Sequence, residues 1–235
     1  SPLNTKGSGF LQKSHTHMII VGTNALYAYE AAAGAYFENK LLSTGDIDIL
    51  WDIRSKLTLA IDENSNPYDF IDVLRKVDKS FEIYGKQTFR VANNDGYMVD
   101  LLKAMPSRVN IKERDRIGGP NDLIAVEVKN LSWLLSSPKF DQVVIGLDGI
   151  PARIVTPDPR AFALHKFWVG NQKDRDPKKK DRDIGQAIAV TQLILDHLPQ
   201  LRFTEDQMQM FPPELVKKFQ ITLDKEEEGS PSMRF

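Results

Sequence analysis

Short apolar runs alternate with amphipathic stretches over the first two thirds of the chain. β-Branched and aromatic residues gather between turn residues, a pattern that favours strands. Strands are predicted at residues 17–22, 46–52, 56–62, 81–85, 88–93, 97–103 and 125–128, with a hairpin at residues 142–157. This part of the sequence therefore predicts a β-sheet.

Apolar residues at helical spacing predict helices between some of these strands and after the last of them. A helix is predicted from Thr23, placed as its N-cap, to residue 37, and a second begins with Pro67. A short helix is expected at residues 131–137, and the polar stretch 103–122 is expected to form a flap or loop. From Pro157 onward the pattern is helical, with helices predicted at residues 158–172, 181–198, 205–211 and 212–223.

Strands followed by helices indicate an α+β (mixed α/β) protein, in which helices flank a mixed sheet and a helical lobe follows. The expected division is a tail at 1–12, a core lobe at 13–156, a helical lobe at 157–223 and a second tail at 224–235. The last segment is charged and then rich in Gly, Ser and Pro, as flexible tails often are.

Composition narrows the class of protein. Apolar residues make up 41% of the 235 positions and charged residues 27%, as in an ordinary globular protein. The formal net charge is −1, so no general positive field attracts nucleic acid, although a local basic patch remains compatible with it. Because the chain has no cysteine, disulfides, thiolate catalysis and cysteine-bound zinc are excluded.

The cellular location is indicated only indirectly. No apolar run approaches the ~20 residues of a membrane span, and residues 1–10 lack the basic start and apolar core of a signal peptide. With the absence of cysteine, this indicates a cytoplasmic protein with no membrane partner. The chain starts with Ser1 instead of Met, as expected of an excised domain or a processed product.

Two carboxylates stand in the strand predicted at residues 46–52. Residues i and i+2 of a strand face the same side, so Asp46 and Asp48 converge while Ile47 and Ile49 point to the opposite face. Neighbouring carboxylates raise each other's pKa unless a cation lies between them. A divalent metal ion would resolve this repulsion, and a satisfied pair on an edge strand is the plainer alternative.

Asp100 is a third carboxylate in an apolar strand. Its position is disfavoured by strand propensity and therefore needs a reason. Three oxygen donors suit Mg²⁺ or Mn²⁺ better than zinc, so Asp46, Asp48 and Asp100 are candidate metal ligands. A salt bridge to Arg90 or Lys103 is the alternative explanation of Asp100.

Gly22 and Thr23 lie where a predicted strand passes into a helix. Free backbone N–H groups at a helix start bind anions, and Gly22 would let a phosphate approach the backbone while the Thr23 hydroxyl donates to it. An ordinary strand–turn–helix has the same pattern. Lys166 lies among the aromatic residues of the helix predicted at 158–172, where a cation needs an anionic partner.

The order of Gly22-Thr23, the Asp46/Asp48 pair and Asp100 resembles the nucleotidyltransferase fold of the DNA polymerase β-like superfamily. That pattern has Gly-Gly or Gly-Ser at the helix start, a D-x-D pair on the next strand and a third acid on a later strand. Thr23 is a mild departure from it. The resemblance covers roughly residues 17–103.

The helical half looks like stand-alone bacterial nucleotidyltransferases of the abortive-infection and toxin type and related uncharacterised families. That resemblance implies that Lys166, Lys180 and Asp181 help to hold the nucleotide. The alternative, from the residues alone, is a solvated loop around Lys180 in which Asp181 or Asp183 caps the next helix, and "DIGQ" resembles a capping box.

The resemblance implies a metal-dependent enzyme that uses Mg²⁺ or Mn²⁺ to transfer NMP from an NTP, such as ATP, to an acceptor with release of pyrophosphate. Asp46, Asp48 and Asp100 would be catalytic. The acceptor stays open between an RNA 3′ end such as that of tRNA, a protein hydroxyl and a small molecule. The alternatives are a catalytically silent, antitoxin-like binding module and a two-metal phosphodiesterase or nuclease, which the lack of a well-placed catalytic His disfavours.

Overall fold

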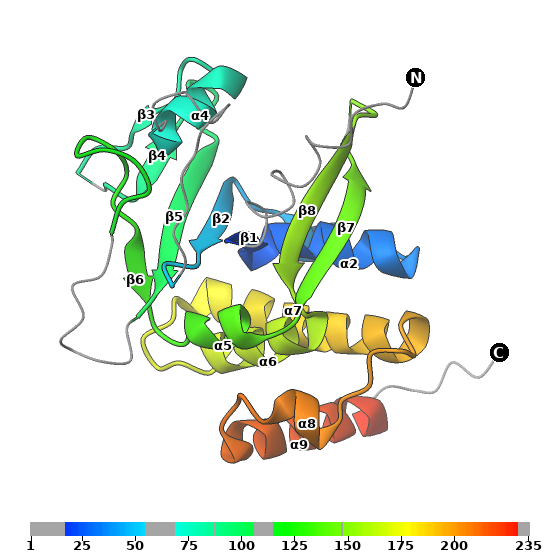
Figure 1. Cartoon of the computed structure of the whole chain (residues 1–235). Helices are drawn as coiled ribbons and strands as arrows, with labels where there is room; N and C mark the ends of the chain where they lie inside the picture. Colours follow the sequence, from blue (N-terminus) through cyan, green and yellow to red (C-terminus); the bar gives the residue numbers. More distant parts are fainter. Residues whose placement is uncertain (1–16, 55–68, 87, 106–114, 147, 230–235) are drawn as a thin grey trace, which may run out of the picture.

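The structure of the protein is a computed structural model, which describes residues 17–54, 69–86, 88–105, 115–146 and 148–229. In this part of the chain a six-stranded mixed sheet lies at the centre (Figure 1). Its strands are, in spatial order, β1 (Met18–Val21), β2 (Asp46–Trp51), β5 (Met98–Ala104), β4 (Arg90–Ala92) and β3 (Glu82–Ile83), with β6 (Val126–Val128) also pairing with β5. The β2–β5 and β5–β6 pairs are parallel and the remaining pairs antiparallel.

A separate hairpin stands beside β1 (Figure 1). It consists of β7 (Lys139–Ile145) and β8 (Pro151–Pro157), which pair antiparallel along their whole lengths. Tyr29 ties the hairpin to the helix that follows β1, because its hydroxyl donates to the carbonyl of Pro157 and its ring packs edge-on against Phe140.

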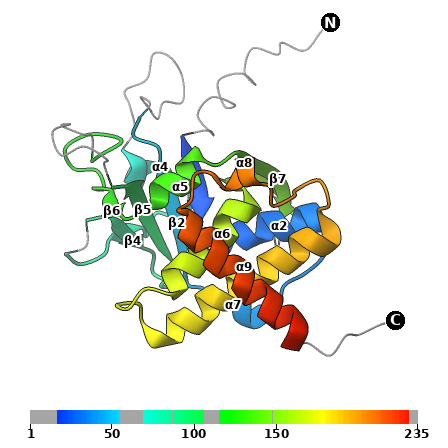
Figure 2. The same ribbon diagram turned by 90° about the horizontal axis from the view of Figure 1, so that it is seen from below.

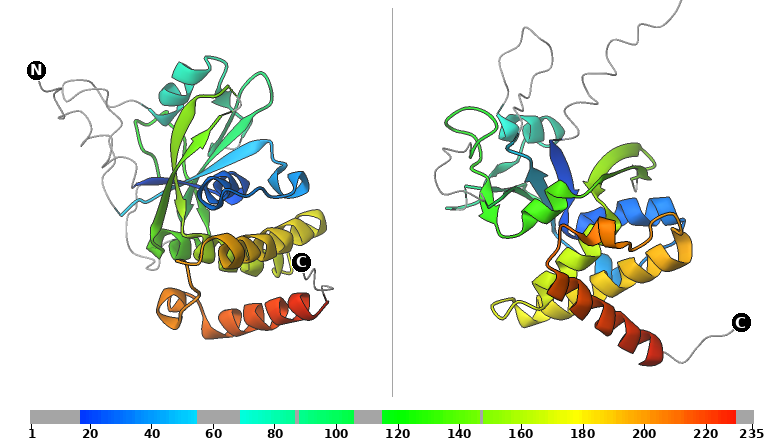
Figure 3. Two further views of the ribbon diagram at one scale, coloured as in Figure 1. Left: turned by 90° about the vertical axis from the view of Figure 1, so that its right-hand side faces the viewer. Right: turned by 60° about the horizontal axis from the view of Figure 1, so that its bottom comes forward.

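Helices cover both faces of the sheet and form a further layer beyond it. They are η2 (Gly22–Ala25), α2 (Leu26–Ala33), α3 (Asn39–Leu42), α4 (Phe70–Val77), α5 (Leu131–Ser136), α6 (Pro159–Gly170), α7 (Pro177–His197), α8 (Glu205–Met208) and α9 (Pro213–Gly229). The pair α6–α7 lies between the sheet and the α8–α9 layer (Figure 3), and α9 crosses beneath the pair (Figure 2). Among the described residues, no helix has the length and apolar character needed to cross a bilayer.

The two faces of β2 pack into different apolar cores. Leu50 belongs to a core shared with α2, α6 and α7, whereas Trp51 belongs to a second core with α4. Ile47 and Ile49 pack against that second core, as the strand period predicted. Asp46 and Asp48 therefore face the side of the sheet on which α6 and α7 lie.

The α+β class, with a mixed sheet and flanking helices, is confirmed. The predicted strand at 56–62 and the helix start at Pro67 lie outside the described residues; the helix is described from Phe70. The helices after residue 157 share one continuous core with β1 and α2. The last helix continues to Gly229, five residues past the expected start of a tail at 224.

Two helix starts differ from the expectation. Thr23 makes no capping bond, because the chain first makes a 3₁₀ turn at Gly22–Ala25 and only then an α-helix. Helix α7 begins at Pro177, where the Asp176 side chain accepts from the Lys178 amide. Pro at the first helical position after an Asp cap is a stronger start signal than the later capping box. Asp181 and Asp183 thus lie inside α7, and the lysine-rich segment is helical.

Candidate functional site

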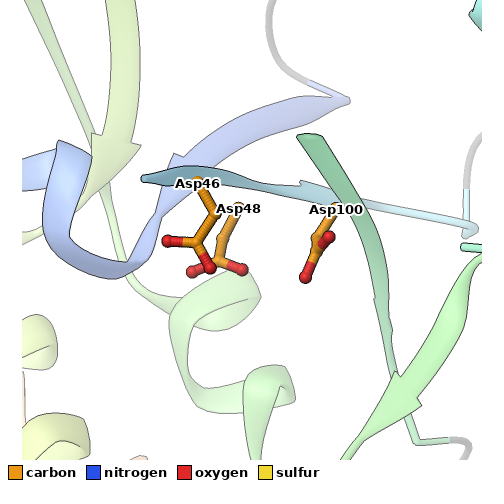
Figure 4. A group of neighbouring side chains, drawn as sticks. All are labelled: Asp46, Asp48 and Asp100. Carbon is orange, nitrogen blue, oxygen red and sulfur yellow. The ribbon is translucent and has the colours of Figure 1, made fainter. Parts of the chain in front are cut away.

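A row of residues crosses four strands of the sheet. Val21 of β1 lies opposite Asp48 of β2, Asp48 opposite Asp100 of β5, and Asp100 opposite Arg90 of β4. Residues opposite one another on paired strands project to the same face. Asp46 lies two residues from Asp48 and faces the same way, so the three carboxylates meet (Figure 4). One oxygen of each lies within 4.8 Å of the other two.

Neighbouring segments hold the β2 carboxylates in place. The Thr44 hydroxyl donates to the Asp46 carboxylate, and the Asn24 side-chain amide donates to the Asp46 carbonyl at 2.7 Å. Gly22 has a positive φ of 64°, and a Cβ on it would overlap the Oδ2 atom of Asp48. Only glycine accommodates both the backbone conformation and this close approach. Gly22 therefore belongs to the site through its contact with Asp48.

The environment of Asp48 disfavours its charged form. Burial raises its pKa from 3.8 to about 6, and the charges of Asp46 and Asp100 act in the same direction, while Lys166 and Arg90 oppose the shift. A carboxylate with a raised pKa among two others is one that a cation would stabilise. Burial plus like charge in one cluster is also the usual arrangement of functional carboxylates.

Asp100 has a strong partner in the same row. Arg90 donates from Nε to Oδ1 at 2.6 Å and from Nη2 to Oδ2 at 2.5 Å, and this bond raises the pKa of the guanidinium. Lys103, the other candidate partner, pairs instead with Glu127 at 3.1 Å. The salt bridge considered as an alternative explanation of Asp100 thus exists, and Asp100 also belongs to the acidic cluster.

The three carboxylates fit a hard divalent cation. They provide only oxygen atoms, at a mutual spacing that one ion can span, which is the donor set of Mg²⁺ and Mn²⁺. Counting Arg90, the ionised cluster carries two uncompensated negative charges. Asp46, Asp48 and Asp100 are therefore the residues that would hold a metal ion.

Lys166 is buried on α6 and does have an anionic partner. Its Nζ donates to Asp183 of α7 at 2.9 Å, and Arg175 donates to the other oxygen of Asp183 at 2.8 Å. Two cations on one fully buried carboxylate leave a net positive charge. Burial lowers the pKa of Lys166, and the attractions to Asp183 and Asp48 oppose that shift. The positive charge of Lys166 thus acts on the acidic cluster, where it opposes the rise in the pKa of Asp48.

Helix α7 contacts both segments that lead into the acidic cluster. Arg182 donates to the carbonyl of Ser43 at 2.9 Å, just before β2. Gln186 donates to the Thr23 hydroxyl oxygen at 3.2 Å and to the Leu41 carbonyl at 2.7 Å. The buried Thr23 accepts this bond, which leaves its own hydroxyl proton free to donate elsewhere.

Lys180 and Asp181 are less closely connected to the site. They lie in the first two turns of α7, where Lys180 is half-buried and Asp181 exposed. In the part of the chain that the structure describes, no hydrogen bond or ion pair joins either of them to the three carboxylates. The structure brings Gly22 into contact with Asp48 and Lys166 into electrostatic reach of it. Thr23 is hydrogen-bonded to Gln186, and neither Lys180 nor Asp181 has such a contact with the cluster among the described residues.

Two contributors were not recognised from the sequence as parts of the site. The sequence offers Asp181 or Asp183 as a helix cap, yet Asp183 recurs at helical spacing with the buried Ala187, Val190 and Ile194, and this phase indicates a buried residue. Gln186 lies on the adjoining buried side of the same helix. A charged residue on the buried face of a helix needs a partner of opposite charge, and for Asp183 that partner is Lys166.

One family of known proteins shares the sequence pattern of most of this chain. The sequence pattern of a family described as nucleotidyltransferase matches residues 7–211. Among solved structures, an antigenic nucleotidyltransferase-like protein from Paracoccidioides brasiliensis is similar, with 16% identity and a TM-score of 0.43 over 97% of this chain and 92% of that one. No curated protein matches the sequence.

Proposed function

Because the chain belongs to the nucleotidyltransferase family, we propose that it is a metal-dependent enzyme that transfers NMP from an NTP to an acceptor hydroxyl and releases pyrophosphate. The observation that carries this proposal is the meeting of Asp46, Asp48 and Asp100 beside Gly22. The proposal places the enzyme in the cytoplasm and leaves ATP as one of several candidate donors.

Asp46, Asp48 and Asp100 would hold Mg²⁺ or Mn²⁺ through their oxygen atoms. The bound ion would supply charge neutralisation at the attacking and leaving oxygens of the displacement at phosphorus. The contribution of the chain is to fix the carboxylates before the substrate arrives. Thr44 holds Asp46 through a hydrogen bond, and the absence of a side chain on Gly22 leaves the space that the Asp48 carboxylate occupies.

The triphosphate would bind between the Gly22-Thr23 turn and Lys166. Backbone amides at the start of a helical segment attract anions, and the Thr23 hydroxyl keeps a proton to donate. Lys166 adds a positive charge. Its ammonium group has three N–H donors, so the donors that do not bond to Asp183 would reach a phosphate oxygen. Lys180 and Asp181 would meet the more distant parts of the nucleotide from the exposed start of α7.

Asp100 would act as a metal ligand in preference to a general base. Its two oxygens already accept hydrogen bonds from Arg90, so both are occupied by a donor before an acceptor hydroxyl arrives. The acceptor itself is proposed only by class, as an RNA 3′ end such as that of tRNA, a protein hydroxyl or a small molecule. An RNA end would meet exposed lysines of α7 such as Lys178 and Lys179.

The decisive test is label transfer. The protein is incubated with each α-labelled NTP, Mg²⁺ or Mn²⁺ and cell extract, and the product that gains label is isolated. Asp48→Ala should abolish transfer, whereas Asp196→Ala, an exposed carboxylate of α7, should leave it unchanged. Transfer by Asp48→Ala at the normal rate would overturn the site assignment. NTP binding without transfer by the unaltered protein would favour the silent, regulatory alternative.

A further inference from the structure

A cavity lies away from the acidic cluster. It encloses about 980 Å³ between the α6–α7 pair and the α8–α9 layer. Ligand pockets in proteins commonly measure about 300–1,000 Å³, so this one is large enough for a small molecule. Figures 1 and 3 show that α6 and α7 separate this layer from the central sheet. None of the residues that the proposed nucleotide site uses lines the cavity.

The wall of the cavity is mainly apolar. Leu164 of α6 and Ile194 of α7 form part of one side, and Phe211 and Phe219 part of the other. These side chains are almost fully buried, whereas Leu195, which also lines the cavity, is 54% exposed. Water makes few hydrogen bonds to such a wall, so its displacement by an apolar molecule would be favourable. Leu195 is thus a part of the cavity wall that solvent reaches.

The charged residues of the lining all have one sign. Arg202 and Lys217 line the cavity, and no Asp or Glu is among its described lining residues. Neither cation forms an ion pair within the described part of the chain, and both are exposed. Arg202 is anchored through its backbone, since its carbonyl accepts from Arg160 at 2.7 Å. An anionic group beside Arg202 and Lys217 would therefore meet two cations without an ion-pair partner in the described chain.

We propose that this cavity binds a single-chain amphiphile with an anionic head, such as a fatty acid. The apolar chain would lie along Leu164, Ile194 and Phe219, and the carboxylate would lie at Arg202 and Lys217. This assignment does not depend on the proposed nucleotidyl transfer, because the cavity and the carboxylates lie on opposite sides of α6 and α7.

Three probes that share a twelve-carbon chain test the proposal, each below the concentration at which it aggregates: dodecanoate, dodecanol and dodecyltrimethylammonium. Each is titrated into the full chain and followed by calorimetry and thermal shift. Dodecanoate should bind at least tenfold more tightly than the other two. The double variant Arg202→Gln/Lys217→Gln should lose that preference, and Leu195→Trp, which enlarges a side chain of the cavity wall, should weaken all binding.

Lys218→Gln is the matched control, because Lys218 neighbours Lys217 on α9 but donates to Asn171 instead of lining the cavity. It should bind dodecanoate like the unaltered protein. The proposal is overturned if dodecanoate does not bind, if dodecanol binds equally well, or if the double variant keeps the preference. Since label transfer plays no part in these measurements, a failure here leaves the proposed function untouched.

Discussion

Arg90 and Asp100 face each other across neighbouring strands and form a bidentate ion pair, with hydrogen bonds of 2.6 and 2.5 Å. The same Asp100 lies within reach of Asp46 and Asp48 in the acidic cluster. Arg90 thus compensates one of three negative charges before any cation binds. Its guanidinium both restrains Asp100 and competes electrostatically with a metal ion for that carboxylate.

Replacing Arg90 by Met should strengthen metal binding. Losing one positive charge a few ångström from the cluster should tighten Mn²⁺ affinity about tenfold at pH 8, or ~1.4 kcal/mol, while the metal-free protein becomes less stable. Arg153→Met is the control, since Arg153 forms a similar pair with Asp141 on the exposed hairpin. Calorimetric Mn²⁺ titrations decide the matter, and weaker binding by Arg90→Met would show that Arg90 mainly positions Asp100.

Gly22→Ala adds only one methyl group but should lower both the stability of the protein and its metal binding. The new methyl group would overlap Asp48 in addition to straining a backbone with φ of 64°. Gly34 has almost the same φ, 63°, with open space around it, so Gly34→Ala isolates the backbone cost of about 1–2 kcal/mol. Urea unfolding should show a larger loss for Gly22→Ala, and only this variant should lose Mn²⁺ binding. Equal effects would mean that Asp48 simply moves aside.

The raised pKa of Asp48 makes a prediction about pH. The folded protein keeps a proton on Asp48 up to about pH 6, whereas the unfolded chain releases it near 3.8. Between these values the folded state binds more protons, so this group's contribution to stability falls as the pH rises. The loss is ~3 kcal/mol at most, and less where water reaches the half-buried group.

Asp48→Asn should remove that pH dependence and make the metal-free protein more stable at pH 7. Urea unfolding from pH 4 to 8 without metal measures it. Mn²⁺ affinity of the unaltered protein should rise through pH 6, because the metal needs the deprotonated carboxylate. An Asn variant with an unchanged slope between pH 4 and 6 would assign the titration to another group.

Local pattern was sufficient to predict the strands that carry the acids. The period of two placed Asp46 and Asp48 on one face and Ile47 on the other, and the structure has this arrangement. That β2 and β5 are neighbours is a matter of topology, which a single strand does not encode. The meeting of Asp100 with the pair was therefore inferred from two indirect signals, an acid that needs a reason in an apolar strand and the resemblance in motif order. The register that sets Asp48 opposite Asp100 came from the structure.

The helical part shows where sequence reasoning failed and why. Three lysines and two acids around residue 180 look like a solvated loop, but Pro177 after Asp176 starts a helix there. That shift turns Asp183 from a cap into the buried partner of Lys166. Long-range ion pairs depend on which helices pack together, and no local spacing determines this.

Lys166→Met tests whether this lysine binds the nucleotide or only neutralises Asp183. Removing one of two cations from a fully buried carboxylate should cost stability, of the order of 2 kcal/mol, because Arg175 remains in place. If Lys166 also contacts the triphosphate, NTP affinity should fall by roughly 1.5–3 kcal/mol, the usual range for a charged hydrogen bond.

Arg175→Met is the matched variant, since it removes the other cation from Asp183 while keeping Lys166. It should destabilise the fold comparably and leave NTP affinity nearly unchanged. Thermal unfolding and calorimetry with a non-hydrolysable NTP analogue and Mg²⁺ separate the two effects. Equal loss of affinity in both variants would show that Lys166 acts only through the buried ion cluster. Loss in Lys166→Met alone would place its ammonium group on the phosphate.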